Sequence, residues 1–184
     1  MRDKRFYIHK LSALAVMLAM SLIMFVVENF LPPLFIVGAK LGLSNIFSLF
    51  SLVIWGPWEA IAITVARAIL GNLIVGNLSS MIYSLTAGVV SICASSLVFC
   101  LCYRKVSLVA VSVLSATLHN LVQNLIFCLL TDNLNMLLLS PYLALLGILA
   151  GLVVGLVTFW LARAIPTSVY KSALPQQKVA KADN

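Results

Sequence analysis

The stretch YLALLGILAGLVVGLVTFWLA, residues 142–162, contains no charged side chain. It is long enough to cross a bilayer, because a helix needs about 20 mainly apolar residues to span the hydrocarbon core. Gly147, Gly151 and Gly155 recur at every fourth position, which leaves a flat stripe along one side of that helix. Small residues at this spacing let a second helix approach closely, so we expect the stripe to pack inside a helix bundle.

The rest of the chain repeats this apolar pattern. It is 62% hydrophobic and 9% charged, whereas about a quarter of the residues are charged in soluble domains. Proline, glycine and polar segments separate the apolar runs, and we predict six transmembrane helices at residues 8–29, 34–54, 58–78, 81–103, 107–131 and 140–163. The predicted fold is an all-α integral membrane protein with a single transmembrane domain, residues 1–166. A polar tail, residues 167–184, is expected to be flexible and cytoplasmic.

Ten of the twelve Lys and Arg residues indicate the orientation in the membrane. They lie near the two ends of the chain and between the fourth and fifth predicted helices: Arg2, Lys4, Arg5, Lys10, Arg104, Lys105, Arg163, Lys171, Lys178 and Lys181. Cytoplasmic loops of membrane proteins carry an excess of Lys and Arg. Six helices with both termini in the cytoplasm place all ten on that side. The net charge of +7 therefore indicates membrane topology and does not indicate nucleic-acid binding.

The two remaining cations, Lys40 and Arg67, lie inside predicted membrane helices. Ionisable residues within a membrane are costly, and by default they indicate a functional site. Lys40 lies close enough to the predicted outer surface for its side chain to reach back to the interface. Arg67 lies near the middle of its helix, where an ion pair with Glu28 or Glu59 is the structural alternative to a binding role.

Uncharged polar residues gather near these cations. His119 and Gln123 are four residues apart on the fifth predicted helix and therefore share a face. Buried amides often only link helices, and that alternative applies to each residue taken alone. Together with two cations, the group predicts a pocket in the outer half of the bundle for a phosphate, diphosphate or carboxylate. The predicted substrate-binding residues are Lys40, Asn45, Arg67, Asn72, His119, Asn120 and Gln123.

The sequence contains no pattern that predicts an enzyme. It lacks a phosphate-binding loop of the GxxxxGK[ST] type. Its aspartates, Asp3, Asp132 and Asp183, are isolated, so they do not form a paired Mg²⁺ site for a diphosphate. The four cysteines lie in apolar segments and are expected to pack as small apolar residues. We predict no catalytic residue, no metal and no cofactor, and ATP-driven transport would require a partner ATPase.

Four stretches of the chain resemble the signature of a known family. The first is ENFLPPLFIVGAKLGLSNIFSL, residues 28–49, whose most specific element is GAKLGLSN at residues 38–45. Residues 67–71, 83–88 and 115–124 add three further matches. On these residues the chain resembles the Gx transporter family, which also bears the name heptaprenyl diphosphate synthase component I. That family is similar to the substrate-binding S components of energy-coupling factor (ECF) transporters.

This resemblance implies a six-helix protein of the bacterial plasma membrane that binds a small vitamin-like or cofactor-like compound near the outer surface. S components dock through alanines spaced by four on their first helix, which Ala15 and Ala19 match. Their partner is a transmembrane T component that carries two ATPase subunits. The resemblance places Pro32 and Pro33 in a gating loop and suggests a flavin, a quinone precursor or a prenyl phosphate as the ligand.

A second hypothesis is a non-transport accessory subunit that anchors a redox enzyme or a prenyl diphosphate synthase. Such a subunit would use the same surface of the first helix but would need no ligand. The polar residues inside the membrane favour the binding protein, because an anchor has no use for them. Synthase activity of the chain itself is not expected, since aspartate-rich Mg²⁺ sites are missing from the sequence.

Overall fold

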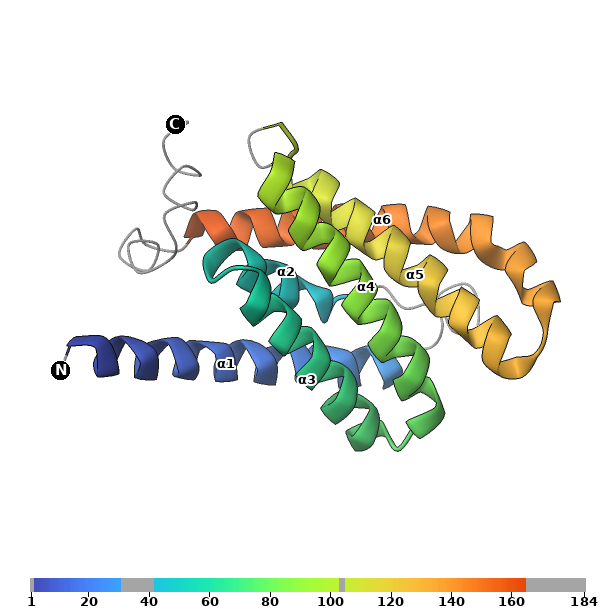
Figure 1. Cartoon of the computed structure of the whole chain (residues 1–184), viewed down its shortest axis with the longest axis horizontal. Coiled ribbons are helices and arrows are strands. Elements are labelled where there is room, and N and C mark those ends of the chain that lie inside the picture. Colours follow the sequence, from blue (N-terminus) through green and yellow to red (C-terminus); the bar gives the residue numbers. More distant parts are fainter. Residues whose placement is uncertain (1, 31–41, 103–104, 165–184) are drawn as a thin grey trace.

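The computed structural model describes residues 2–30, 42–102 and 105–164, with side chains from residue 7 onward. The helices are α1 (Arg2–Phe30), α2 (Asn45–Ile54), α3 (Pro57–Val75), α4 (Leu78–Cys102), α5 (Leu108–Thr131) and α6 (Ser140–Ala164), with a 3₁₀ helix, η1 (Leu134–Leu139), before α6 (Figure 1). Within these ranges, 5 helical segments are long and apolar enough to cross a membrane. The prediction of an all-α membrane protein is therefore confirmed.

The second predicted helix, residues 34–54, is confirmed only in its second half. α2 has 10 residues, about 15 Å at 1.5 Å per residue, and is too short to cross the bilayer. Residues 42–44 form a turn in which Gly42 has a left-handed φ of 69°, and the Asn45 N–H donates to the Gly42 carbonyl at 2.8 Å. The helix prediction is wrong at residues 42–44 because this φ does not continue a right-handed helix. Residues 34–41 lie outside the described residues.

α2 occupies the centre of the bundle. All of its residues except Asn45 and Phe47 are buried. Ile46, Leu49 and Leu52 pack in one apolar cluster with residues of α3, α4, α5 and α6. On another side of the helix, Phe50 and Ile54 pack with α1 and with the end of α6. The short helix therefore connects the long helices through their buried faces.

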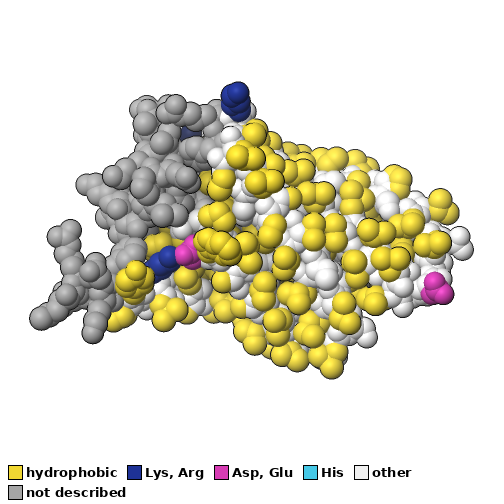
Figure 2. All heavy atoms as spheres, in the orientation of Figure 1, with side chains coloured by type: hydrophobic (Ala, Val, Ile, Leu, Met, Phe, Trp, Pro, Cys, Tyr) yellow, Lys and Arg dark blue, Asp and Glu magenta, His cyan; other side chains and the backbone are white. Residues whose placement is uncertain are grey.

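The surface of the long helices is mainly apolar. Figure 2 shows hydrophobic side chains over most of the described surface on the side displayed, and large residues such as Leu70, Ile82 and Leu149 are exposed. Such a surface suits lipid and not water. The start of α1 and the end of α6 lie at the same end of the bundle (Figure 1), in agreement with an even number of crossings. The assignment of that end to the cytoplasm stays a prediction from the cations.

The glycine stripe of α6 packs directly on α5. A β-carbon added to Gly147 would lie 2.7 Å from the Thr117 Cα, and one added to Gly151 would lie 2.5 Å from the Val113 Cα. Both distances are too short for real atoms, so these positions admit only glycine unless the helix backbones separate. The expectation that the stripe packs within the bundle is confirmed, and α5 and α6 form a closely packed pair.

Replacing Gly151 by leucine is expected to destabilise the protein, because the new side chain meets the α5 backbone and cannot rotate away from it. Overpacking of this kind costs about 1–3 kcal/mol or more. The matched control is Ala110→Leu, which adds the same side chain at an exposed position of α5. Thermal unfolding in detergent should show a drop of several degrees for Gly151→Leu alone. Equal midpoints for the two variants would contradict the close packing.

Candidate ligand-binding site

Arg67 is a buried cation on α3, with 3% of its surface exposed. Gly71, one turn later, allows α1 to approach α3, since a β-carbon there would lie 2.7 Å from the Phe25 ring. The Arg67 Nη1 group donates a hydrogen bond to the Ser44 hydroxyl. The Nε and Nη2 groups find no hydrogen-bond acceptor among the described residues. Two donor nitrogens of a buried guanidinium therefore remain available to a ligand.

Glu28 on α1 holds the turn that presents Ser44 to Arg67. Its Oε1 accepts a hydrogen bond from the Leu43 N–H at 2.8 Å, and its Oε2 lies 3.5 Å from the Ser44 hydroxyl. The Ser21 hydroxyl donates to the Ser44 carbonyl at 2.9 Å. Glu28 and Arg67 are thus linked through Ser44, and the carboxylate lies beside the cation.

Glu59, the other acidic residue considered for Arg67, belongs to a different interaction. Its carboxylate forms an ion pair with Lys10 of α1, and the Lys10 ammonium also lies 5.7 Å from the centroid of the Trp55 ring. The alternative in which Glu59 pairs with Arg67 is therefore wrong. Glu59 is two helical turns before Arg67, at the end of the bundle where α1 begins (Figure 1).

Arg67 faces a cavity that we name the arginine pocket. Its polar lining comes from α1, the 42–44 turn and α2 to α5: Glu28, Ser44, Asn45, Arg67, Ser84, His119, Asn120 and Gln123. The structure thus brings together five of the predicted site residues, namely Asn45, Arg67, His119, Asn120 and Gln123. Their role in binding stays a prediction. Lys40, Pro32 and Pro33 lie outside the described residues.

Some amides near the pocket also link helices. The Asn120 side chain donates to the Leu143 carbonyl of α6 at 3.2 Å. Asn124, one turn further on α5, donates to the Ser140 hydroxyl at 3.1 Å. The structural alternative weighed for single amides therefore applies to Asn120, which both lines the pocket and ties α5 to α6.

Asn72 does not line the pocket. Its amide nitrogen donates to the Ala68 carbonyl at 2.6 Å, and its amide oxygen accepts a hydrogen bond from the Ser80 hydroxyl of α4. It follows Arg67 by five positions, and with 3.6 residues per turn the two side chains point to different faces of α3. Asn72 ties α3 to α4 and is not among the residues that line the two pockets, so its predicted role in binding finds no support in their lining.

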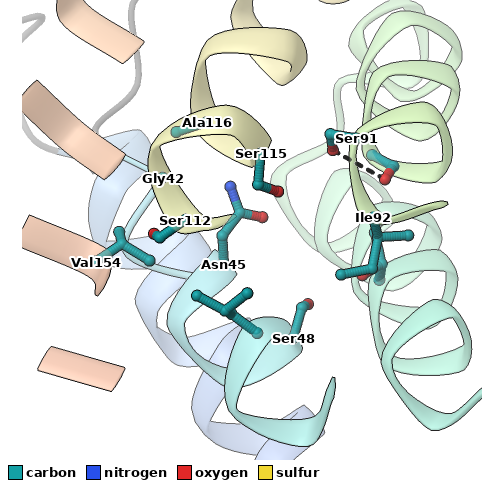
Figure 3. Close-up of a pocket in the computed structure, with 12 residues that line it drawn as sticks. Gly42, Asn45, Ser48, Ser91, Ile92, Ser112, Ser115, Ala116 and Val154 are labelled. Atoms are coloured by element: carbon teal, nitrogen blue, oxygen red, sulfur yellow. Dashed lines mark hydrogen bonds between the residues drawn. The ribbon is translucent and has the colours of Figure 1, made fainter. Parts of the chain in front are cut away.

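A second cavity, the serine pocket, adjoins the arginine pocket, and the two share Gly42, Asn45 and Ala116. Figure 3 shows four serine side chains around it, with the Asn45 amide directed into the space: Ser48, Ser91, Ser112 and Ser115. The prediction from sequence missed these serines. Their spacing carried a signal, since Ser112 and Ser115 precede His119 by seven and four positions and so lie on the same face of α5.

The pockets are narrow in this structure. Each pocket has a volume of about 20 Å³, which is room for about one water molecule. The Ser91 hydroxyl lies 3.5 Å from the His119 Nδ1 atom, which joins the walls of the two pockets. A vitamin-sized ligand therefore requires the groups around the pockets to rearrange.

Replacing Asn72 by alanine is expected to lower stability by about 0.5–1.5 kcal/mol, because the hydrogen bond between α3 and α4 is lost while the Ser80 hydroxyl keeps the Asn77 carbonyl as an acceptor. The comparison is Asn45→Ala, whose amide lines the two pockets and should contribute less to stability. Thermal unfolding midpoints of both variants in detergent test this assignment. A larger loss for Asn45→Ala than for Asn72→Ala would reverse the two roles.

Comparison with known proteins identifies the family. Searches of curated proteins and of solved structures found no significant match. Residues 17–161 match the family model described as heptaprenyl diphosphate synthase component I, and this region contains every residue that lines the two pockets. Since the match covers well over half of the sequence, the chain belongs to the heptaprenyl diphosphate synthase component I family, in agreement with the resemblance seen in the sequence.

Proposed function

We propose that this protein is the substrate-binding S component of an ECF-type transporter and that it binds a small anionic compound. The observation that carries the proposal is Arg67, whose Nε and Nη2 donors have no acceptor among the described residues although the side chain is 3% exposed. A buried donor without an acceptor costs about 1–3 kcal/mol, and more when the group is charged. An anionic ligand would remove that cost.

The geometry of the guanidinium supports a carboxylate or phosphate. Nε and Nη2 lie side by side on one edge of the planar group, and two oxygens of one anion can accept from that edge at once. The third nitrogen, Nη1, is already held by Ser44, so the orientation of the free edge is fixed. Asn45, His119 and Gln123 border the same pocket and offer hydrogen bonds to the rest of the ligand.

The outer surface of α1 supports docking to a T component. Ala15 and Ala19 are exposed, whereas Ala13, Leu14 and Met17 of the same helix pack against Phe50, Ile54 and Trp55. The alanine pair thus lies on the side of α1 that faces away from the bundle, where small side chains let another helix approach closely. The proposed partners are a T component and two ATPase subunits in a bacterial plasma membrane.

The description of the family as a synthase component favours one alternative, a membrane accessory subunit of a prenyl diphosphate synthase. This alternative uses the same face of α1 and assigns no ligand to Arg67. The two proposals therefore differ in the bound small molecule and in the partner proteins.

Replacing Arg67 by alanine should reduce bound ligand at least ~10-fold, because loss of one partner of a buried charge pair costs about 2–5 kcal/mol. The protein would be purified gently from its native membrane, denatured, and the released small molecules quantified by mass spectrometry. Arg67→Lys keeps the positive charge but loses the paired Nε and Nη2 donors, so this variant should retain part of the bound ligand. The control is Arg163→Ala, which removes an exposed cation at the end of α6.

Two results would count against this proposal. One is an unchanged ligand content in a folded Arg67→Ala protein, as judged by size-exclusion chromatography and thermal unfolding. The other is wild-type protein that carries no small molecule and is not stabilised by added flavin, quinone-precursor or prenyl-phosphate probes. The second result would favour the accessory subunit.

Replacing Ala15 and Ala19 by leucine should abolish docking while leaving ligand content unchanged, because large side chains on this face keep a partner helix at a distance. Partner proteins that co-purify from native membranes would be identified by mass spectrometry, with at least a ~10-fold loss of T component and ATPases expected. Ala62→Leu, at an exposed position of α3, is the matched control. Undiminished co-purification, or recovery of a prenyl diphosphate synthase instead, would contradict the proposed docking face.

A further inference from the structure

The serine pocket lies one to two helical turns further into the bundle than the arginine pocket. At the start of α2, Ser44 lines the arginine pocket and Ser48 lines the serine pocket. On α6, Ala150 lines the arginine pocket and Val154 lines the serine pocket. On α5, which runs in the opposite direction, His119 lines the arginine pocket, and the earlier residues Ser115 and Ser112 line the serine pocket. On each of these helices, the residues of the serine pocket lie closer to the end of the bundle where α1 begins (Figure 1). A ligand held by Arg67 would therefore extend into the serine pocket if it continued along the bundle.

Two hydroxyl groups of the serine pocket have no hydrogen-bond partner among the described residues. They belong to Ser48 and Ser112, which are 2% and 1% exposed. Ser91 and Ser95 on α4 behave differently: Ser91 donates to the Gly88 carbonyl at 3.0 Å, and Ser95 donates to the Ser91 carbonyl at 2.6 Å. Serines buried among apolar helices usually satisfy themselves in this way. Ser48 and Ser112 do not. Both line the same cavity, and the Ser112 hydroxyl lies on its α6 side, next to Gly155.

We propose that the serine pocket binds a neutral, hydrogen-bonding part of the anionic ligand, with Ser48, Ser112 and the Asn45 amide as its partners. This inference rests on the proposed function, because it extends the Arg67 site. One helical turn separates Ser44, which holds Arg67, from Ser48. The anionic group and the neutral polar groups of the ligand therefore lie about 5 Å apart or slightly more.

The apolar residues that line the serine pocket restrict the class of possible ligands further. Leu49, Ile92 and Val154 supply apolar surface between the hydroxyl groups. A compact ring with a hydroxyl, carbonyl or amide substituent matches this mixture, because its faces contact the apolar side chains and its edge meets the serines. A prenyl chain does not match it, since hydrocarbon offers no hydrogen-bond partner to either hydroxyl. The ligand class is thus a small ring acid with neutral polar substituents.

The test compares ligand content and ligand identity in protein purified from native membranes. The double variant Ser48→Ala/Ser112→Ala removes both hydroxyls, and mass spectrometry would quantify and identify the small molecule released by wild type and variant. Ser96→Ala is the matched control, because Ser96 is also buried and without a hydrogen-bond partner among the described residues but lines neither pocket. We expect at least a ~10-fold loss in the double variant and none in the control.

Identification of the wild-type ligand gives a readout that does not depend on how well the variants fold. A ring acid with polar substituents, lost from the double variant, would support the inference. A prenyl or alkyl phosphate, or equal ligand content in folded wild-type and double-variant protein, would overturn it while leaving the Arg67 proposal intact. Wild-type protein without a ligand, and without stabilisation by 1,4-dihydroxy-2-naphthoate, flavin mononucleotide or geranyl phosphate, would overturn both.

Discussion

The burial of the Arg67 guanidinium inside an apolar helix bundle is the constraint on which the rest of the centre depends. A cation in this environment requires nearby oxygen atoms, and the 42–44 turn before α2 supplies one of them, the Ser44 hydroxyl. The 42–44 turn exposes backbone groups that a continuous helix would have used internally. Irregular backbone within a membrane protein is tolerated only where protein or a cavity surrounds it. Here Glu28 accepts from the Leu43 N–H, and Ser21 donates to the Ser44 carbonyl, so the same contacts that stabilise the turn also orient Ser44 toward Arg67.

The close pair of α5 and α6 provides a wall for this polar centre. Glycines on α6 bring the two backbones together, and α5 presents His119 and Gln123 to the arginine pocket on another part of its surface. A binding site needs side chains whose positions are set by rigid elements. Polar residues of α5 recur every three or four positions toward the pocket, and Asn120 and Asn124 on the same helix also bond to α6.

Charged and amide residues inside apolar runs could be predicted from the sequence to lie near one another. Glycines and serines could not be singled out, because they are common in such runs. Arg67 and the polar group of α5 were found because charge and amides are rare in apolar runs, and their periodicity put them on one face. The turn at Gly42 was missed because an apolar run that contains two glycines, Gly38 and Gly42, also fits a continuous helix. Asn72 was misplaced, since an amide that ties two helices has the same composition signal as one that binds a ligand. The serines were overlooked because serine is common in membrane helices and usually bonds to its own backbone.

The two faces of α1 connect the proposed ligand site to the proposed docking surface. Ala19 lies on the outer face, and Glu28, nine positions later or about 14 Å along the helix, lies on the inner face beside Arg67. The inner face holds the 42–44 turn through Ser21 and Glu28, and that turn carries Ser44, the hydrogen-bond acceptor of Arg67. A shift of α1 relative to α2 and α3 would therefore alter the guanidinium environment without any direct contact between partner and ligand. Since the pockets are too narrow for a vitamin-sized molecule as they stand, some rearrangement of the groups around them is required for binding, and α1 is the helix through which a docked partner would act on it.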